Sequence, residues 1–132
     1  MRILFDTNVL FAAFTVRGFC DELIEETVDL CTLVWSTPLH NELVHALRRK
    51  RLLSPAAVAA IAAFSDLCEI VKPMRLPKRI CRDPDDDIVF ATALAGHADL
   101  IMTADGDLLV LKRFSGIRIL SPRQTLEILH TK

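Results

Sequence analysis

The chain has 132 residues, of which 52% are hydrophobic and 25% are charged, so it is long enough for one well-packed domain and too apolar for a disordered chain. Its formal net charge of −1 excludes nucleic-acid binding driven by overall charge and leaves only a local basic patch for such a role. No hydrophobic run approaches the roughly 20 residues of a membrane span, and the first residues lack the pattern of a signal peptide, so we expect a cytoplasmic protein without a membrane partner.

Short apolar runs alternate with segments of helical periodicity along the chain. Runs of this length are typical of strands that are buried on both faces of a sheet. They predict strands at residues 2–5, 31–35, 68–71, 99–103 and 117–120. The segments between and after these runs predict helices at residues 6–14, 18–30, 36–53, 54–67, 85–96 and 121–131, with a further short helix after residue 105.

Residues that begin and end helices stand at the expected boundaries. Proline follows a hydroxyl residue at the start of three segments, which makes Thr37, Ser54 and Ser121 the predicted N-caps. Gly96 is a natural stop for the helix that begins near residue 85. Strands that alternate with helices in this way predict an α/β fold, with a mainly parallel central sheet flanked by helices in three layers. Because the sequence has no linker or repeat, we expect residues 1–132 to form a single domain.

Three acidic residues are expected at one edge of this sheet. Asp6 directly follows the first strand and Asp105 follows the fourth, and sites in parallel sheets lie outside the carboxyl ends of the strands. Glu42 is in the second turn of the helix after the second strand and points toward the same edge. Taken alone, Asp6 is also explained as a helix cap, and Glu42 as a flank residue favoured by the helix dipole.

The stretch "DPDDD" at residues 83–87 places four aspartates at the start of the fifth long helix. Asp86 has Val89, Phe90 and Ala93 at helical spacing, so it shares the most apolar face of the helix. A charge on such a face is costly unless it is paired or binds a metal. An acidic helix start with Asp83 as the cap explains Asp83 and Asp85 well but explains Asp86 poorly.

Four carboxylates could therefore converge at one sheet edge, those of Asp6, Glu42, Asp86 and Asp105. Oxygen ligands without histidine or cysteine suit Mg²⁺ or Mn²⁺, and one or two such ions would offset the repulsion among the acids. Sites of this kind typically act on phosphates.

The motifs "LFDTNVL", "NELVHAL", "DPDDDIVFATAL" and "LIMTADGDLL", in this order, resemble those of the PIN-domain ribonucleases, in particular the VapC-like toxin components of bacterial and archaeal toxin–antitoxin pairs. The resemblance covers nearly the whole chain. It implies a metal-dependent endoribonuclease that is often a homodimer and is held inactive by an antitoxin protein. Matched residue by residue, the family's catalytic and metal-binding tetrad falls on the same four acids.

Further residues follow from the same match. Asn8 and Thr103 correspond to polar positions that support the site, Asp87 is an alternative to Asp86 as the main ligand, and Asp107 is an auxiliary position. The basic loop at residues 72–82 leads into the acidic cluster but matches no motif. Its candidates for RNA binding are Lys78, Arg79 and Arg82. The basic run at residues 48–51 is better explained by cations at a helix C-terminus than by RNA contact.

Two other classes of function stay open. One is a PIN-like module whose main role is to bind a partner protein, with little turnover. The other is a phosphatase of the haloacid-dehalogenase type, which also ends its first strand in aspartate. That class requires a second aspartate two residues later, where this chain has Asn8, so it is the weaker alternative.

Overall fold

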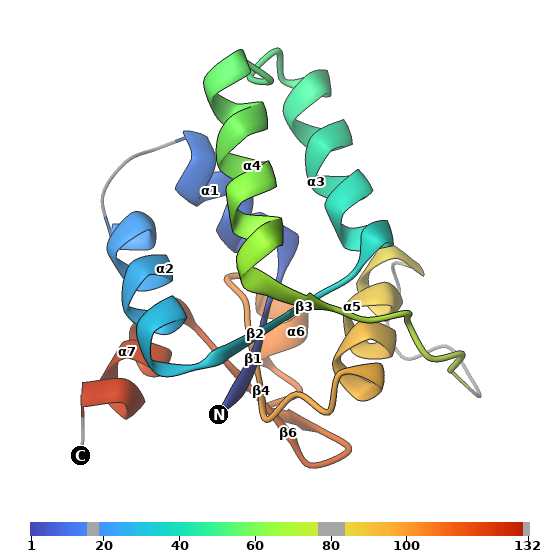
Figure 1. Ribbon diagram of the computed structural model, residues 1–132. Helices are drawn as coiled ribbons and strands as arrows, with labels where there is room; N and C mark the ends of the chain where they lie inside the picture. The colour runs from blue at the N-terminus through green and yellow to red at the C-terminus, as the bar shows by residue number, and fades with distance from the viewer. Residues whose placement is uncertain (16–18, 77–83, 131–132) are drawn as a thin grey trace.

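A six-stranded sheet forms the centre of the computed structural model, which describes residues 1–15, 19–76 and 84–130, with the backbone only for 19–23 and 84–86 (Figure 1). The strands are β1 (Arg2–Phe5), β2 (Thr32–Trp35), β3 (Cys68–Ile70), β4 (Leu100–Met102), β5 (Arg113–Phe114) and β6 (Ile117–Leu120). Their order is β3-β2-β1-β4-β6-β5, and all neighbours are parallel except β5 and β6. The predicted mainly parallel α/β fold is therefore confirmed.

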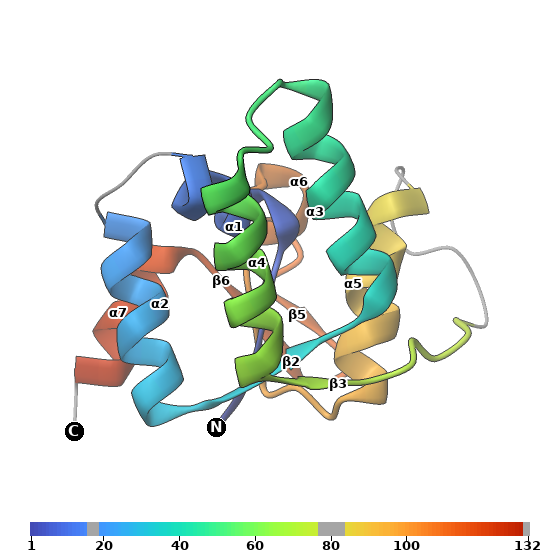
Figure 2. The same ribbon diagram turned by 45° about the horizontal axis from the view of Figure 1, so that its top comes forward.

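Seven helices flank the sheet in the described part of the chain. They are α1 (Thr7–Thr15), α2 (Phe19–Leu30), α3 (Thr37–Arg49), α4 (Pro55–Leu67), α5 (Pro84–Ala95), α6 (Gly106–Leu109) and α7 (Pro122–His130). Figures 1 and 2 show α3 and α4 side by side, projecting from the sheet as an antiparallel pair, and α2 beside α7. Within the described ranges, no helix has the length and hydrophobicity that crossing a lipid bilayer requires.

The core lies on the central strands. Every residue of β4 is fully buried, and β1 buries Ile3, Leu4 and Phe5, as continuous apolar runs require. Phe64 of α4 packs against Phe5 and makes an edge-on contact with Trp35, with ring centroids 5.6 Å apart for the latter pair. Burial of each such side chain contributes roughly 1.5–3 kcal/mol. This core fixes where β1 and β4 end.

Two of the three predicted helix caps are confirmed, and one is wrong by a residue. The Ser54 hydroxyl accepts a hydrogen bond from the Ala57 amide, and Ser121 forms a reciprocal pair with Gln124. The cap of α3 is Ser36 rather than Thr37. The hydroxyl of Ser36 does not bond the helix end but lies 2.9 Å from that of Thr92 in α5.

The antiparallel strand β5 was not predicted from the sequence. It is only two residues long and joins β6 through a tight turn at Ser115 and Gly116, both of which have positive φ. That conformation is typical of a two-residue hairpin. Because each strand segment is so short, hydrophobic alternation could not reveal the pairing.

The end of α5 depends on Gly96 for space. The helix ends one residue before the predicted stop, and the residue in the left-handed conformation is His97, with φ of 51°. Gly96 is needed instead because a Cβ atom there would lie 2.3 Å from Cγ1 of Val34 in β2. The helix can therefore lie close against the sheet only without a side chain at this position.

Gly96→Ala is expected to lower the free energy of unfolding by about 1–3 kcal/mol, because the added methyl group overpacks a buried contact. Gly106→Ala is the matched control, since a Cβ there meets no atom within 4 Å. It should change stability by less than about 0.5 kcal/mol. Urea unfolding of the three proteins measures both values, and equal midpoints for the wild type and Gly96→Ala would contradict the close packing.

Candidate active site

Two neighbouring parallel strands end together at the candidate site. Asp6 follows β1, and its amide donates a 2.8 Å hydrogen bond to the carbonyl of Met102, the last residue of β4. Thr103 and Asp105 follow β4 directly. The sheet pairing itself therefore brings the two aspartates together, as the sequence predicted from their places after the strands.

The Asp6 carboxylate is buried, with 3% of the residue exposed, and two threonines surround it. The hydroxyl of Thr103 donates to Oδ2 at 2.7 Å, and that of Thr7 lies 3.5 Å from Oδ1. Burial raises the pKa of Asp6, and the nearby charge of Asp105 acts in the same direction, whereas the hydrogen bonds from Thr103 and Thr7 act against it. Within the described residues, no cation forms an ion pair with either aspartate.

Glu42 reaches the same place from α3. The Thr7 hydroxyl donates to Oε1 of Glu42 at 3.2 Å and so lies between the carboxylates of Glu42 and Asp6. Sequence reasoning missed Thr7. Its only signal was its position between Asp6 and Asn8 at the start of α1, where a hydroxyl can contact both acids.

Asp105 has two roles in the geometry. Its Oδ1 accepts a 2.9 Å hydrogen bond from the Asp107 amide and so caps the short helix α6. Its own amide donates to the Thr103 hydroxyl at 3.0 Å, which ties it to the threonine that holds Asp6. Asp105 therefore caps α6 and at the same time stays close to Asp6.

The two outer polar positions are exposed. Asn8 Oδ1 accepts a 3.4 Å hydrogen bond from the amide of Ala104 and links the start of α1 to the segment after β4. Asp107 contributes its amide to the Asp105 cap. Asn8 and Asp107 therefore lie at the edge of the candidate site, and their predicted supporting and auxiliary roles stay predictions.

The first turn of α5 carries the remaining predicted acids. Asp86 is in the helix, but its side chain lies outside the described residues, as do Asp83 and the predicted RNA-binding residues Lys78, Arg79 and Arg82. Asp87 is half-buried, and Ile88 follows it. The contact between Ser36 and Thr92 holds α5 beside the start of α3, so the backbone places this turn near Glu42.

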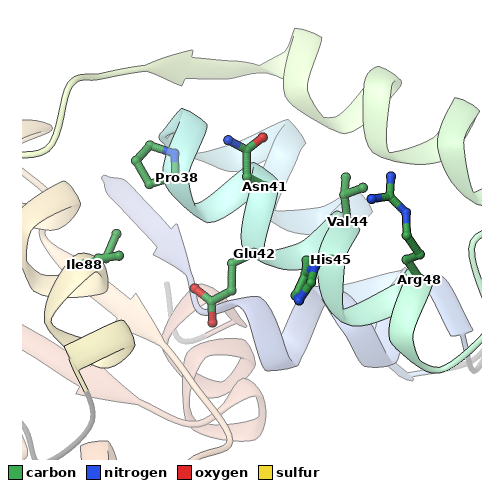
Figure 3. Close-up of a pocket in the computed structure, with 7 residues that line it drawn as sticks. All are labelled: Pro38, Asn41, Glu42, Val44, His45, Arg48 and Ile88. Atoms are coloured by element: carbon green, nitrogen blue, oxygen red, sulfur yellow. The ribbon is translucent and has the colours of Figure 1, made fainter.

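A groove of about 550 Å³ opens from Glu42 along α3 (Figure 3). Residues of α3 form most of its lining, and Ile88 of α5 faces Glu42 across it. The lining residues are Pro38, Asn41, Glu42, Val44, His45, Arg48 and Ile88. One acid of the site is therefore shared with a groove that could receive a larger molecule.

Thr7 lies between the carboxylates of Asp6 and Glu42, and Thr103 joins the Asp6 carboxylate to the backbone amide of Asp105, so the acidic side chains here offer only oxygen donors. Such donors suit hard divalent cations. In the side chains that the structure describes, no three acidic, histidine or cysteine groups are close enough to enclose an ion as they stand. The first turn of α5 carries further acidic residues, Asp85 and Asp86, whose side chains lie outside the described part of the structure.

Comparison with known proteins gives a consistent result. The family model described as PIN domain matches residues 2–107, and no curated protein matched the chain. A chain of VapBC2 from Rickettsia felis, crystallised with a DNA fragment from their promoter, is 15% identical with a TM-score of 0.67, over 92% of this chain and 98% of that one. VapBC-1 from nontypeable Haemophilus influenzae is 16% identical with a TM-score of 0.62, over 93% of this chain and 99% of that one. PAE2754 from Pyrobaculum aerophilum is 14% identical with a TM-score of 0.60, over 100% of this chain and 91% of that one. At these identities the likeness to the solved structures shows a shared fold.

Proposed function

The chain belongs to the PIN-domain family, and from this we propose that it is a metal-dependent endoribonuclease that hydrolyses RNA phosphodiester bonds as the toxin of a toxin–antitoxin pair. The observation that carries the proposal is the buried carboxylate of Asp6 at the end of β1, which is connected to Glu42 through the Thr7 hydroxyl and to the amide of Asp105 through the Thr103 hydroxyl. Solved VapBC structures with the same fold support the toxin–antitoxin part.

We assign the metal and catalytic positions to Asp6, Glu42, Asp86 and Asp105. The donor chemistry fits Mg²⁺ or Mn²⁺, because the described donors are all oxygens and Asp6 has no cationic partner among the described residues. Asp86 is the proposed fourth member because Val89, Phe90 and Ala93, which follow it at helical spacing, are all buried, so position 86 lies on the inward face of α5. Asp87 is the alternative at that position.

When bound, the ion supplies positive charge for a phosphate oxygen and lowers the pKa of a water molecule. The protein's part is to hold the ligands in place beforehand. Thr103 fixes Oδ2 of Asp6, and Thr7 restrains both Asp6 and Glu42, so neither acid must be ordered when substrate arrives. Glu42, at the mouth of the groove, is placed to orient the attacking water and accept its proton.

A cognate antitoxin and a second copy of the chain are the proposed protein partners. The support for the antitoxin is that two of the similar solved structures are VapBC complexes. The homodimer rests on the family resemblance.

Purified protein is expected to cleave RNA with Mn²⁺ or Mg²⁺ and to lose the activity in chelator. The assay uses single-stranded and hairpin RNAs with each ion alone and with chelator followed by repletion. Restored cleavage after repletion supports the proposal. If no cleavage occurs with either ion while an antitoxin still binds, the chain is a protein-binding module instead. Cleavage that persists in chelator would overturn the metal dependence.

A further inference from the structure

The groove beside the acidic site follows one face of α3. Asn41, His45 and Arg48 are spaced by four and three residues, so they lie above one another along the helix. Glu42 borders the same face near the N-terminal end, and Figure 3 shows it and His45 extending to the same side of α3. The groove is therefore a continuous path from the acidic site toward the C-terminal end of the helix.

Charge changes sign along this path. The Glu42 end adjoins Asp6 through Thr7, whereas Arg48 lies in the last turn of α3 and is exposed. Among the described residues, no carboxylate forms an ion pair with Arg48. An exposed cation on the wall of a groove that begins at Glu42 is placed to hold a negatively charged ligand whose other part lies at the acidic site.

We propose that the groove holds the RNA strand on one side of the scissile bond, with Arg48 and His45 contacting a backbone phosphate and Asn41 the adjoining nucleotide. This inference rests on the proposed ribonuclease function. It adds a substrate-binding surface on α3 that is independent of the basic loop at residues 72–82.

The dimensions agree with a short stretch of RNA. Arg48 is six positions after Glu42, which corresponds to about 9 Å along the helix axis. At about 3.4 Å per phosphate along a stacked strand, this spans two to three nucleotides. Val44 and Ile88 supply apolar surface for a base or ribose between the two ends.

The acidic site itself explains why such a surface is needed. Carboxylates repel the phosphates of the substrate, and one or two bound ions offset this only at the scissile bond. Flanking phosphates therefore need cations outside the acidic cluster, since the chain as a whole has a net charge of −1. An RNA strand uses both ends of the groove, whereas an acidic peptide would use only Arg48 and His45.

Arg48→Ala tests the proposal, and Arg49→Ala is its matched control. Both arginines are exposed in the last turn of α3, and each change removes one positive charge, but Arg49 does not line the groove. Cleavage of a fluorescent single-stranded RNA of mixed sequence gives kcat and KM. Binding of the same RNA to the Asp6→Asn forms of each protein, at several salt concentrations, gives the salt dependence.

Arg48→Ala is expected to raise KM about tenfold, because a charged hydrogen bond to phosphate is lost, and to leave kcat unchanged. The slope of log K against log salt should become shallower by about 0.7. Arg49→Ala should change neither quantity, and Arg48→Lys should recover part of the loss.

The outcomes separate this inference from the proposed function. If the wild type cleaves no RNA with either ion, the function itself fails. If it cleaves but Arg48→Ala and Arg49→Ala behave alike, the groove does not bind the strand, and the inference is overturned. It is also overturned if Arg48→Ala weakens only the binding of an acidic protein partner and leaves RNA kinetics unchanged.

Discussion

Asp6→Asn is expected to reduce metal-dependent RNA cleavage at least about a thousandfold. Asparagine keeps the shape of the side chain and can still bond Thr103, but it removes the negative charge from the most buried of the described acids of the site. Loss of a metal ligand removes several kcal/mol of transition-state stabilisation, and each 1.4 kcal/mol corresponds to a factor of ten in rate. Initial rates at saturating Mn²⁺ measure the effect.

The control for this experiment is Asp66→Asn. Asp66 is exposed on α4, away from the ends of β1 and β4, so the same chemical change there should leave the rate within about twofold. Circular dichroism should show that both variants are folded. Cleavage by Asp6→Asn at near wild-type rate, with the ion in excess, would remove Asp6 from the catalytic set.

Mn²⁺ is expected to raise the melting temperature of the wild type, and Asp6→Asn is expected to melt higher than the wild type in chelator. An ion that binds only the folded state stabilises it by about 2.7 kcal/mol at a hundredfold excess over Kd. Without the ion, the buried carboxylate of Asp6 near Asp105 is a cost to the folded state. The amide avoids this cost but should gain much less from Mn²⁺.

The pH dependence of stability tests whether the ionised carboxylate of Asp6 destabilises the folded protein in the absence of metal. Burial raises the pKa of Asp6 in the folded protein, so the folded state binds this proton more tightly than the unfolded chain does. In chelator, the stability that the protonated Asp6 contributes is fully present below the ordinary pKa of an aspartate, and it is lost as pH rises through the raised pKa of Asp6 in the folded protein. The gap between Asp6→Asn and the wild type should therefore widen across this acidic range and then stay constant. A mutant that melts lower than the wild type at pH 7.5 in chelator would show that the ionised carboxylate is stabilising.

The sequence was sufficient for the strands that carry the site, because their apolar runs are continuous, with Asp6 immediately after β1 and Asp105 shortly after β4. It was less reliable where a boundary depends on a distant partner. Ser36 caps α3 although its hydroxyl lies against Thr92 of α5, and nothing near Ser36 in the sequence indicates that contact. Gly96 was correctly placed at a helix end, but the structure requires glycine there because the side chain of Val34 leaves no space for a Cβ atom.

The candidate site shows the same division. Asp6, Glu42 and Asp105 were placed together from strand ends and helix phase, and the structure brings them together through Thr7 and Thr103. Thr7 was not predicted, because a hydroxyl that lies between two acids produces no repeating pattern in the sequence. The groove was not predicted either, because the outer face of a helix produces no such pattern. Asp86, Lys78, Arg79 and Arg82 stay predictions.

The order of the strands also has a consequence for the timing of activity during synthesis. β1 comes before the other described strands of the sheet in the chain, but it lies between β2 and β4, and β4 begins only at Leu100. Asp6 receives its hydrogen bond from Thr103 only after that segment has been translated and has docked. A growing chain therefore carries Asp6 long before Thr103, and the surroundings of Asp6 are not complete until the segment from Leu100 to Thr103 has been made. Pairings between such distant segments form late in folding, so the proposed ribonuclease activity should appear with completion of the sheet and not before it.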